Sequence, residues 1–283
     1  MIPAAAMRRF LICAAAGGLL YAASQTYRAE MADWRRQQEA ELKADDGWLT
    51  VTGLFWLHEG ANRFGSGPAN EIVLPRDPAW KGGGAFDLDH GKVIMHMDGV
   101  TRELRADSAA APDLVTLGSL SLLVIRRGDR YGIRLKDRNS RLRKEFTGLR
   151  YFPVNESYRV SARFVADARK IPIANILGQT EDTPSPGYVE FDLEGRKLRL
   201  TPVEESPNKL FFIFRDLTSG RETYGSGRFL DAPVPKDGRV ELDFNKAYNP
   251  PCAFTPYATC PLPPKQNRLP VPIAAGELKY GVH

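Results

Sequence analysis

The sequence has few of the side chains that bind metal ions or act as nucleophiles. Three cysteines and four histidines stand among its 283 residues. Ser66 and Ser226 each lie between two glycines, but neither forms the Gly-x-Ser-x-Gly motif of a nucleophile elbow. No glycine-rich loop carries the lysine and hydroxyl residue of a P-loop. The sequence therefore predicts no cofactor and no metal, and it names no reaction.

Charge of one sign is also scarce. The chain carries 39 Lys and Arg against 34 Asp and Glu, a formal net charge of +5. The densest basic run, residues 134–145, includes Asp137 and Glu145 and is typical of a solvated turn between elements. Because the positive residues are so mixed with acids, we expect no nucleic acid as a partner.

The N-terminus has an apolar run, but this run is short. The apolar run there, residues 10–22, is shorter than the roughly 20 apolar residues that span a bilayer. Two arginines precede it, and Ala22 and Ser24 offer the small side chains of a cleavage site. This pattern predicts a signal peptide over residues 1–24 and a periplasmic or secreted protein. The alternatives are a twin-arginine signal and an inner-membrane anchor over residues 10–22. We expect the chain to contact a membrane only through this segment, and only if it is not cleaved.

One helix is expected after the signal. Residues 27–45 contain no Gly or Pro and many strong helix formers, with Met31, Trp34 and Leu42 as a thin apolar face. Because this face is so narrow, we expect segment 25–46 to be a helical spacer that packs weakly against the rest.

From Trp48 onward, short runs rich in β-branched and aromatic residues alternate with turn signals. Asp98-Gly99, Glu194-Gly195 and Asp237-Gly238 separate neighbouring runs in the way hairpins require. Strands at such spacing without intervening helices predict a mainly β chain. We place a boundary near residue 145, with a β-sandwich over residues 47–145 and a second antiparallel sheet or barrel-like domain over residues 146–283.

The most distinctive segment is residues 249–264, whose six prolines exclude a helix or a central strand. Cys252 and Cys260 lie in it and are the cysteines that remain once Cys13 is removed with the signal. In an oxidising compartment we expect them to form a disulfide. A metal pair and a redox-active dithiol are the alternatives, although no histidine lies near and the spacing is wider than Cys-x-x-Cys.

Polar and aromatic side chains surround this loop in the sequence. We expect them to form a ligand site on a platform of neighbouring strands, with the tyrosines as flat apolar surface. The competing interpretation is structural: Arg228 pairs with Asp243, and the asparagines satisfy backbone groups of the loop. The ligand-binding candidates are Tyr224, Arg228, Asp243, Asn245, Tyr248, Asn249, Asn267 and Glu277.

Four segments carry a family resemblance: residues 46–66, 223–230, 242–254 and 259–277. They are similar to DUF1684, a bacterial domain family of unknown function, and the resemblance covers nearly everything from residue 48 to residue 277. It implies no activity, because none is established for the family.

A second resemblance concerns layout. In residues 48–126, Phe64-Gly65-Ser66 leads into a strand, Asp98-Gly99 follows, and residues 115–125 close the set. This order is similar to a forkhead-associated (FHA) β-sandwich and implies an FHA-like fold. It does not imply phosphopeptide binding, because Ser66 stands where that family has an arginine and no Ser-x-x-His follows.

Three functions are compatible with these patterns. The first is an exported ligand-binding or interaction protein of the bacterial cell envelope, for a small polar ligand, a glycan or a peptide. The second is a hydrolase with Asp243 or Glu277 as general base and Tyr248 or Arg228 stabilising charge. The third is a purely structural envelope protein. A pocket lined by Tyr and Asn indicates the first, a carboxylate buried in a cleft indicates the second, and the third requires no pocket.

Overall fold

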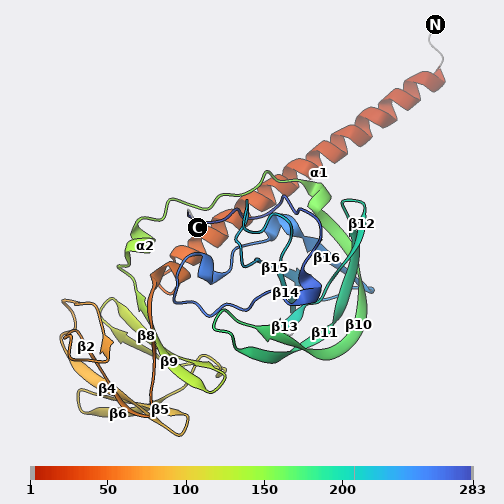
Figure 1. The fold of residues 1–283 in the computed structure, drawn as a ribbon. Coiled ribbons are helices and arrows are strands. Elements are labelled where there is room, and N and C mark those ends of the chain that lie inside the picture. Colours follow the sequence, from red (N-terminus) through yellow and green to blue (C-terminus); the bar gives the residue numbers. More distant parts are fainter. Residues whose placement is uncertain (1–3, 207, 282–283) are drawn as a thin grey trace.

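The computed structural model describes residues 4–206 and 208–281. A long N-terminal helix, α1 (Ala4–Lys43), precedes two β-rich halves (Figure 1). The chain is mainly β, as the sequence predicted, and the strands of the described residues form four sheets.

The first half is a sandwich of two sheets. Their facing side chains share one apolar core that includes Phe64, Phe86, Leu122 and Ile133. The predicted sandwich is therefore present, while the likeness to the FHA layout stays a prediction. One sheet has the order β1 (Val51–Trp56), β9 (Arg130–Asp137), β8 (Leu120–Arg127) and β7 (Leu114–Leu117). The other has the order β3 (Ile72–Val73), β2 (Gly60–Gly65), β4 (Gly83–Asp89), β5 (Lys92–Met97) and β6 (Val100–Leu104).

The second half contains two open antiparallel sheets. One has the order β12 (Arg196–Leu200), β11 (Thr180–Leu193), β10 (Arg159–Ala174) and β16 (Arg239–Asp243). The other has the order β13 (Val203–Ser206), β14 (Lys209–Phe214) and β15 (Arg228–Pro233). The C-terminal tail adds Leu269, Val271, Ile273 and Ala275 to the core of this half. Because alternate tail residues are buried, the residues that follow them are held firmly against the sheets.

The three turn dipeptides lie where the sequence predicted hairpin turns. Asp98 and Gly99 have φ of 50° and 77°, and Glu194 and Gly195 have φ of 51° and 70°. The third pair, at positions 237 and 238, has φ of 51° and 72°. Two successive residues with positive φ define the type I′ turn, whose twist matches that of the flanking strands. The first two pairs join paired strands, β5 with β6 and β11 with β12, so these two hairpins are confirmed. The third turn closes only a bridge between Lys236 and Arg239, because β15 and β16 belong to different sheets.

Helix α1 packs closely against the second half, so the expectation of a weakly packed spacer is wrong. Tyr27 and Met31 are 4% and 0% exposed. Glu39 accepts a hydrogen bond from the Leu149 backbone at 2.8 Å, and Arg35 donates to the Phe152 carbonyl at 3.0 Å. The apolar face alone underestimates this packing, because polar side chains supply much of the attachment.

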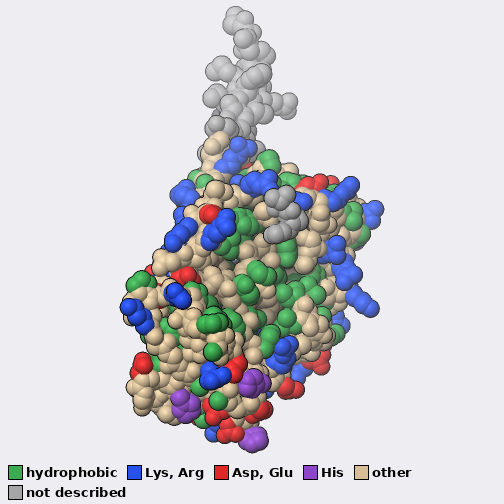
Figure 2. Space-filling model, turned by 60° about the vertical axis from the view of Figure 1, so that its left-hand side comes forward, with side chains coloured by type: hydrophobic (Ala, Val, Ile, Leu, Met, Phe, Trp, Pro, Cys, Tyr) green, Lys and Arg blue, Asp and Glu red, His purple; other side chains and the backbone are tan. Residues whose placement is uncertain are grey.

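The helix continues without interruption across the predicted cleavage point, and its N-terminal part extends away from the sheets (Figure 1). Residues 1–3 of the predicted signal lie outside the described residues. Within the described part of the chain, no helix combines enough length with enough apolar character to span a membrane. Figure 2 shows positive and negative side chains interspersed over one face, with apolar side chains gathered in its middle.

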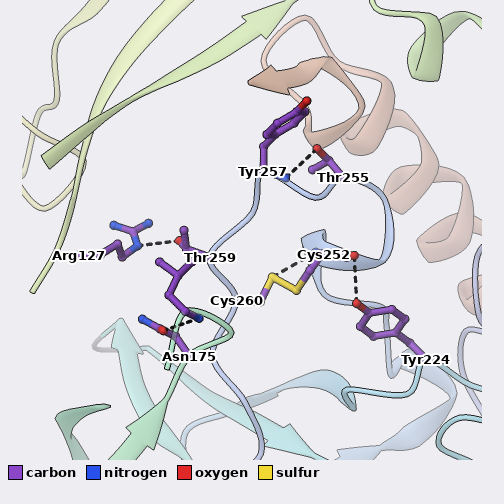
Figure 3. The surroundings of a disulfide bond; sticks show 9 residues. Arg127, Asn175, Tyr224, Cys252, Thr255, Tyr257, Thr259 and Cys260 are labelled. Carbon is purple, nitrogen blue, oxygen red and sulfur yellow. Dashed lines mark hydrogen bonds between the residues drawn. A yellow bond between two sulfur atoms is a disulfide. The ribbon is translucent and has the colours of Figure 1, made fainter. Parts of the chain in front are cut away.

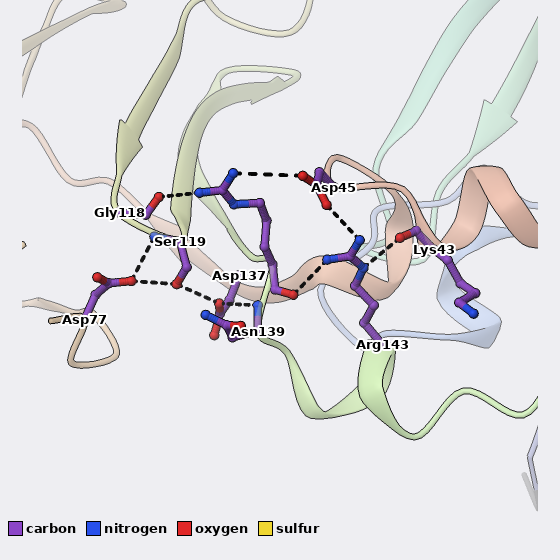
Figure 4. Close-up of polar contacts among 9 residues, drawn as sticks. Lys43, Asp45, Asp77, Gly118, Ser119, Asp137, Asn139 and Arg143 are labelled. Atoms are coloured by element: carbon purple, nitrogen blue, oxygen red, sulfur yellow. Dashed lines mark hydrogen bonds and ion pairs between the residues drawn. The ribbon is translucent and has the colours of Figure 1, made fainter. Parts of the chain in front are cut away.

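A polar network joins the end of α1 to the segment that follows the first half (Figure 4). Arg143, in α2 (Arg141–Lys144), donates to the Lys43 carbonyl at 2.6 Å and pairs with Asp45 at 2.7 Å. The basic run 134–145 is therefore not one solvated turn. It begins inside β9, where Arg134 is buried, and its far end holds the helix terminus.

Candidate functional site

The proline-rich loop is closed by the predicted disulfide (Figure 3). Cys252 and Cys260 are bonded, with their Cα atoms 6.2 Å apart, and the Cys252 amide donates to Cys260 Sγ at 3.2 Å. The hydroxyl of Tyr224, one of the predicted site residues, donates to the Cys252 carbonyl at 3.1 Å. Tyr224 thus braces the loop beside the disulfide.

The same loop also contacts the first half. Arg127 of β8 donates through Nε to Thr259 Oγ1 at 2.7 Å. Thr255 Oγ1 donates to the Val51 carbonyl at 3.0 Å. These two bonds attach the loop of the second half to strands β8 and β1 of the first half. The loop therefore contacts both halves.

Arg228 is a buried cation inside the second half. Its Nη2 pairs with Asp216 Oδ2 at 2.7 Å and donates to the Ile273 carbonyl at 3.0 Å. Burial lowers the pKa of the guanidinium, and the Asp216 charge opposes that shift. The predicted pairing of Arg228 with Asp243 is wrong: Asp216 lies just beyond β14, the strand that pairs with the start of β15, and is therefore the nearer acid.

Asp243 and Asn245 form a separate buried set with α1. The Tyr27 hydroxyl lies 2.8 and 2.9 Å from the two carboxylate oxygens of Asp243. Asn245 Nδ2 donates to the Tyr27 hydroxyl at 3.0 Å, and Asn245 Oδ1 accepts from the Asn155 amide at 3.0 Å. Burial, followed by the bond to Asp243, raises the pKa of Tyr27. This set attaches the helix to the end of β16.

Asn267 joins two strand ends. Its Oδ1 accepts from the Thr201 amide at 2.8 Å, and its Nδ2 donates to the carbonyls of Thr201 and Ile213 at 2.8 and 2.9 Å. With both ends of its amide bonded to backbone, Asn267 fixes the start of the C-terminal tail.

The remaining three candidates meet at one cavity. It has a volume of about 270 Å³ and lies between α1, the start of the first half, the strands β14 and β15, the proline-rich loop and the C-terminal tail. Tyr248, Asn249 and Glu277 belong to its wall. The other lining residues are Gln38, Glu41, Leu42, Trp48, Lys209, Asp231, Pro251 and Phe254.

Glu277 is the buried acid of this cavity. Its side chain accepts from the Asn249 amide at 2.8 Å, and the Tyr151 hydroxyl lies 3.5 Å from its other oxygen. Burial raises the pKa of Glu277 to about 7, against the bond from the Asn249 amide. Gly276 sets its position: φ is 79°, and a Cβ there would lie 2.5 Å from the Ala247 carbonyl oxygen. Only glycine allows the tail to approach so closely.

Asn249, in the wall of the same cavity, has an unsatisfied buried acceptor. The residue is 4% exposed, and its Nδ2 donates to the Leu278 carbonyl at 2.8 Å. Its Oδ1, the other end of the amide, is buried and has no hydrogen-bond partner among the described residues. Leaving a buried acceptor unpaired costs about 1–3 kcal/mol, so a donor that reached it would bind favourably.

Tyr248, in the cavity wall, is fixed by contacts with Asp231 and Phe229. Its hydroxyl donates to Asp231 Oδ2 at 3.2 Å, and its ring lies edge-on to Phe229 with centroids 5.8 Å apart. Asp231 also pairs with Lys209 at 3.1 Å. The tyrosine thus presents a fixed aromatic surface, and the ion pair beside it is part of the wall.

A second cavity lies beside the first and shares part of its wall. Its volume is about 370 Å³, and it shares Trp48, Tyr248 and Pro251 with the first cavity. Beyond them it is lined by Phe211, Phe229, Cys260, Pro261, Arg127 and Thr259. The two cavities therefore lie beside each other along the disulfide loop and share an aromatic wall, and together they are called the groove, with its acidic end at Glu277.

The described residues contain no group of three or more His, Cys, Asp or Glu side chains that could hold a metal ion. The chemistry that the groove offers is hydrogen-bond acceptance, from Asn249 and Glu277, next to aromatic surface.

Sequence reasoning missed most of the cavity wall. Trp48, Lys209 and Asp231 come from elements far from the proline-rich loop along the chain, and the last turns of α1 complete the enclosure. A signal for Asp231 was present: it follows the apolar pair Phe229-Leu230, and a lone acid there breaks the apolar run of β15. Nothing in the sequence indicated that α1 would reach the site.

Comparison with known proteins gives a family without an assigned activity. The model of the family described as "Protein of unknown function (DUF1684)" matches residues 144–278. A solution NMR structure of an uncharacterized protein from Haloarcula marismortui is 32% identical, and the match covers 48% of this chain and 78% of that one, with a TM-score of 0.41. No curated protein matches the sequence.

Proposed function

The chain belongs to the DUF1684 family of proteins of unknown function, and we propose that it is an exported protein of the bacterial cell envelope that binds a small polar ligand in the groove over Glu277. The ligand is a short piece of a glycan or a peptide. The single observation that carries this proposal is the buried carboxyl of Glu277 in the wall of a cavity that Trp48, Tyr248 and Phe254 also line.

The shape and lining of the groove support ligand binding. Small-molecule sites are concave, largely apolar, and carry a few fixed polar groups that orient the ligand. Trp48, Tyr248 and Phe254 supply apolar surface, and Asn249 and Glu277 supply the fixed acceptors. The disulfide and the buried tail hold these groups before any ligand arrives, which lowers the entropy cost of binding.

Export is supported by two features at opposite ends of the chain. The first is the basic and apolar pattern of the first 24 residues. The second is the bond between Cys252 and Cys260, since structural disulfides form and persist in oxidising compartments. Both fit a periplasmic or secreted protein.

A hydrolase that uses Glu277 is the second candidate function. A carboxyl with a pKa of about 7 in a cavity has the properties of a general base at neutral pH. Asp243 is a poorer choice, because both of its oxygens already accept from Tyr27. Arg228, the other proposed charge stabiliser, is fully buried with Asp216.

A thermal-shift screen tests the proposal. The full chain is heated with a panel of cell-wall oligosaccharides and di- and tripeptides, and each compound that raises the melting temperature is assayed for turnover. We expect at least one compound to stabilise the wild type and Tyr257→Phe, a control on the exposed part of the loop. The variant Tyr248→Leu should lose that response while keeping its own cooperative transition. A response that survives in Tyr248→Leu would place the binding site elsewhere, and turnover of a bound compound would favour the hydrolase.

A further inference from the structure

We propose that the groove binds its ligand through a protonated amine, which sits between Glu277, Asn249 and the aromatic wall. This inference rests on the proposed function and names the chemical class of the group that occupies the acidic end. An amino sugar or the N-terminus of a peptide carries such a group. Four properties of the cavity support it.

The first is the balance of charge. Three acids line the cavity, Glu41, Asp231 and Glu277, against one base, Lys209. Lys209 pairs with Asp231 at 3.1 Å, so the charges of Glu41 and Glu277 are not matched by another lining cation among the described residues. A cation entering the cavity therefore meets net negative charge, and an anion is repelled.

The second is the type of hydrogen-bonding group. Asn249 Oδ1 is a buried acceptor without a partner, and Glu277 in its ionised form only accepts. An ammonium group has three donors and no acceptor, which matches this pair of groups. A carboxylate, which only accepts, would find no donor in Glu277 and would be repelled by its charge.

The third is the aromatic wall. Trp48, Tyr248 and Phe254 all line the cavity. The faces of aromatic rings attract cations, and tryptophan does so most strongly. Arg134 already lies over the Trp48 ring, with its Cζ 5.0 Å from the centroid, so the attraction for an alkylammonium rests mainly on Tyr248 and Phe254.

The fourth is that the cations near Glu277 already have their own partners. Arg228 is paired with the buried Asp216 at 2.7 Å. Arg35 lies over the Tyr151 ring, 4.3 Å from its centroid, and donates to the Phe152 carbonyl. The contacts of the Glu277 carboxyl are instead two neutral donors, the Asn249 amide and the Tyr151 hydroxyl. Arg228 and Arg35 attract the Glu277 charge without a hydrogen bond to it, and a bound ammonium would supply a counter-charge in direct contact.

Proton linkage follows from this arrangement. The groups that surround Glu277 are Tyr151, Arg35 and Arg228 on the protein side and Glu41, Asp231 and Lys209 in the cavity wall. Glu277 itself has a pKa of about 7, so its charge changes near neutral pH. Only its ionised form attracts the ammonium fully, so the affinity should rise by about tenfold between pH 6 and pH 8, and binding should release a proton.

Isothermal titration with three matched probes tests the inference. Phenethylamine, 2-phenylethanol and 3-phenylpropanoate share one apolar body and carry a cationic, a neutral and an anionic head. Each is titrated into the full chain at pH 6 and pH 8, in two buffers of different ionisation enthalpy. We expect the amine to bind at least tenfold more tightly than the alcohol at pH 8 and the carboxylate to bind most weakly. Amine binding should release a proton at pH 6 and almost none at pH 8, where Glu277 is already ionised.

Two variants and one control separate a binding role from a folding role. Glu277→Gln should weaken the amine at least tenfold at pH 8 and remove the pH dependence, with little change for the alcohol. Glu41→Gln changes an exposed side chain of α1 that lines the cavity, so it should fold normally and weaken the amine a few-fold. Glu145→Gln, on the exposed side of α2, is the matched control and should change nothing.

The outcomes distinguish this inference from the proposed function. Equal binding of amine and alcohol, or tighter binding of the carboxylate, would overturn the inference and leave a ligand site in place. The same holds if the three probes fail while a neutral compound from the oligosaccharide and peptide panel binds. If no probe and no panel compound binds, the proposed function itself fails.

Discussion

The hydroxyl of Tyr27 donates to the carboxylate of Asp243, 216 residues away, at 2.8 Å from one oxygen and 2.9 Å from the other. Tyr27 is the third residue after the predicted signal, and Asp243 ends the last strand of the second half. The bond holds α1 against the end of β16. Residues near the C-terminal end of α1 line the groove.

Replacing Tyr27 by Phe removes this bond and leaves the buried Asp243 carboxylate with fewer donors. We expect the free energy of unfolding to fall by about 1–3 kcal/mol, the cost of an unsatisfied buried acceptor. Urea denaturation followed by circular dichroism measures it. Tyr257→Phe, at an exposed position, is the control. An unchanged unfolding midpoint in Tyr27→Phe would show that the helix contributes little, as a spacer would.

The ion pair of Arg228 and Asp216 should behave as a structural pair. Arg228→Met leaves Asp216 charged and buried without its partner, so we expect a loss of about 3–5 kcal/mol. The double variant Arg228→Met with Asp216→Leu should recover much of that loss, because no lone charge remains. Equilibrium unfolding of the two single variants and the double variant gives the coupling energy. A double variant as unstable as the sum of the singles would contradict the pairing.

The disulfide should stabilise the loop and the groove together. Replacing Cys252 and Cys260 by serine opens a loop of about nine residues, which costs about 2–3 kcal/mol on the chain-entropy model. Non-reducing peptide mapping of periplasmic material should find the two residues in one linked fragment. Two free thiols in that material would refute the bond and remove the main support for export.

Glu277 should make the protein less stable as the pH rises through neutrality. Its pKa is raised from its usual value near 4.5 to about 7, so between these values the folded state holds a proton that the unfolded state releases. The stabilisation is fully present below about pH 4.5 and is lost as the pH rises through about 7, by about 3 kcal/mol.

Glu277→Gln keeps an acceptor for the Asn249 amide but cannot ionise. We therefore expect this variant to match the wild type at pH 5 and to exceed its stability at pH 8, and denaturation at both pH values measures the difference. Identical pH profiles for the two proteins would show that Glu277 titrates near its usual value.

Local chemistry made much of the fold predictable. The Asp-Gly and Glu-Gly pairs adopt positive φ at the turns, and the short β-branched and aromatic runs after Trp48 indicated the strands. The disulfide was predictable because two cysteines share one stiff loop. These features depend on neighbours in sequence, which is why short patterns suffice.

The site was only partly predictable, because it depends on contacts between distant segments. Tyr248, Asn249 and Glu277 were expected and line the cavity, whereas Arg228, Asp243, Asn245 and Asn267 hold backbone segments or buried charges in place. All of them are polar residues next to the same loop, and the sequence does not show which are buried with partners. Trp48 and the last turns of α1 reach the cavity only through the tertiary fold.

Amine binding over an ionised Glu277 is measured most directly through the ionisation of this carboxyl, with and without a bound amine. ¹³C NMR of the glutamate carboxyl carbons, assigned with Glu277→Gln, follows this group through a pH titration. We expect a midpoint near pH 7 in the free protein that falls by at least one unit when phenethylamine saturates the groove. A midpoint near 4.5 that does not move when the amine is added would contradict it.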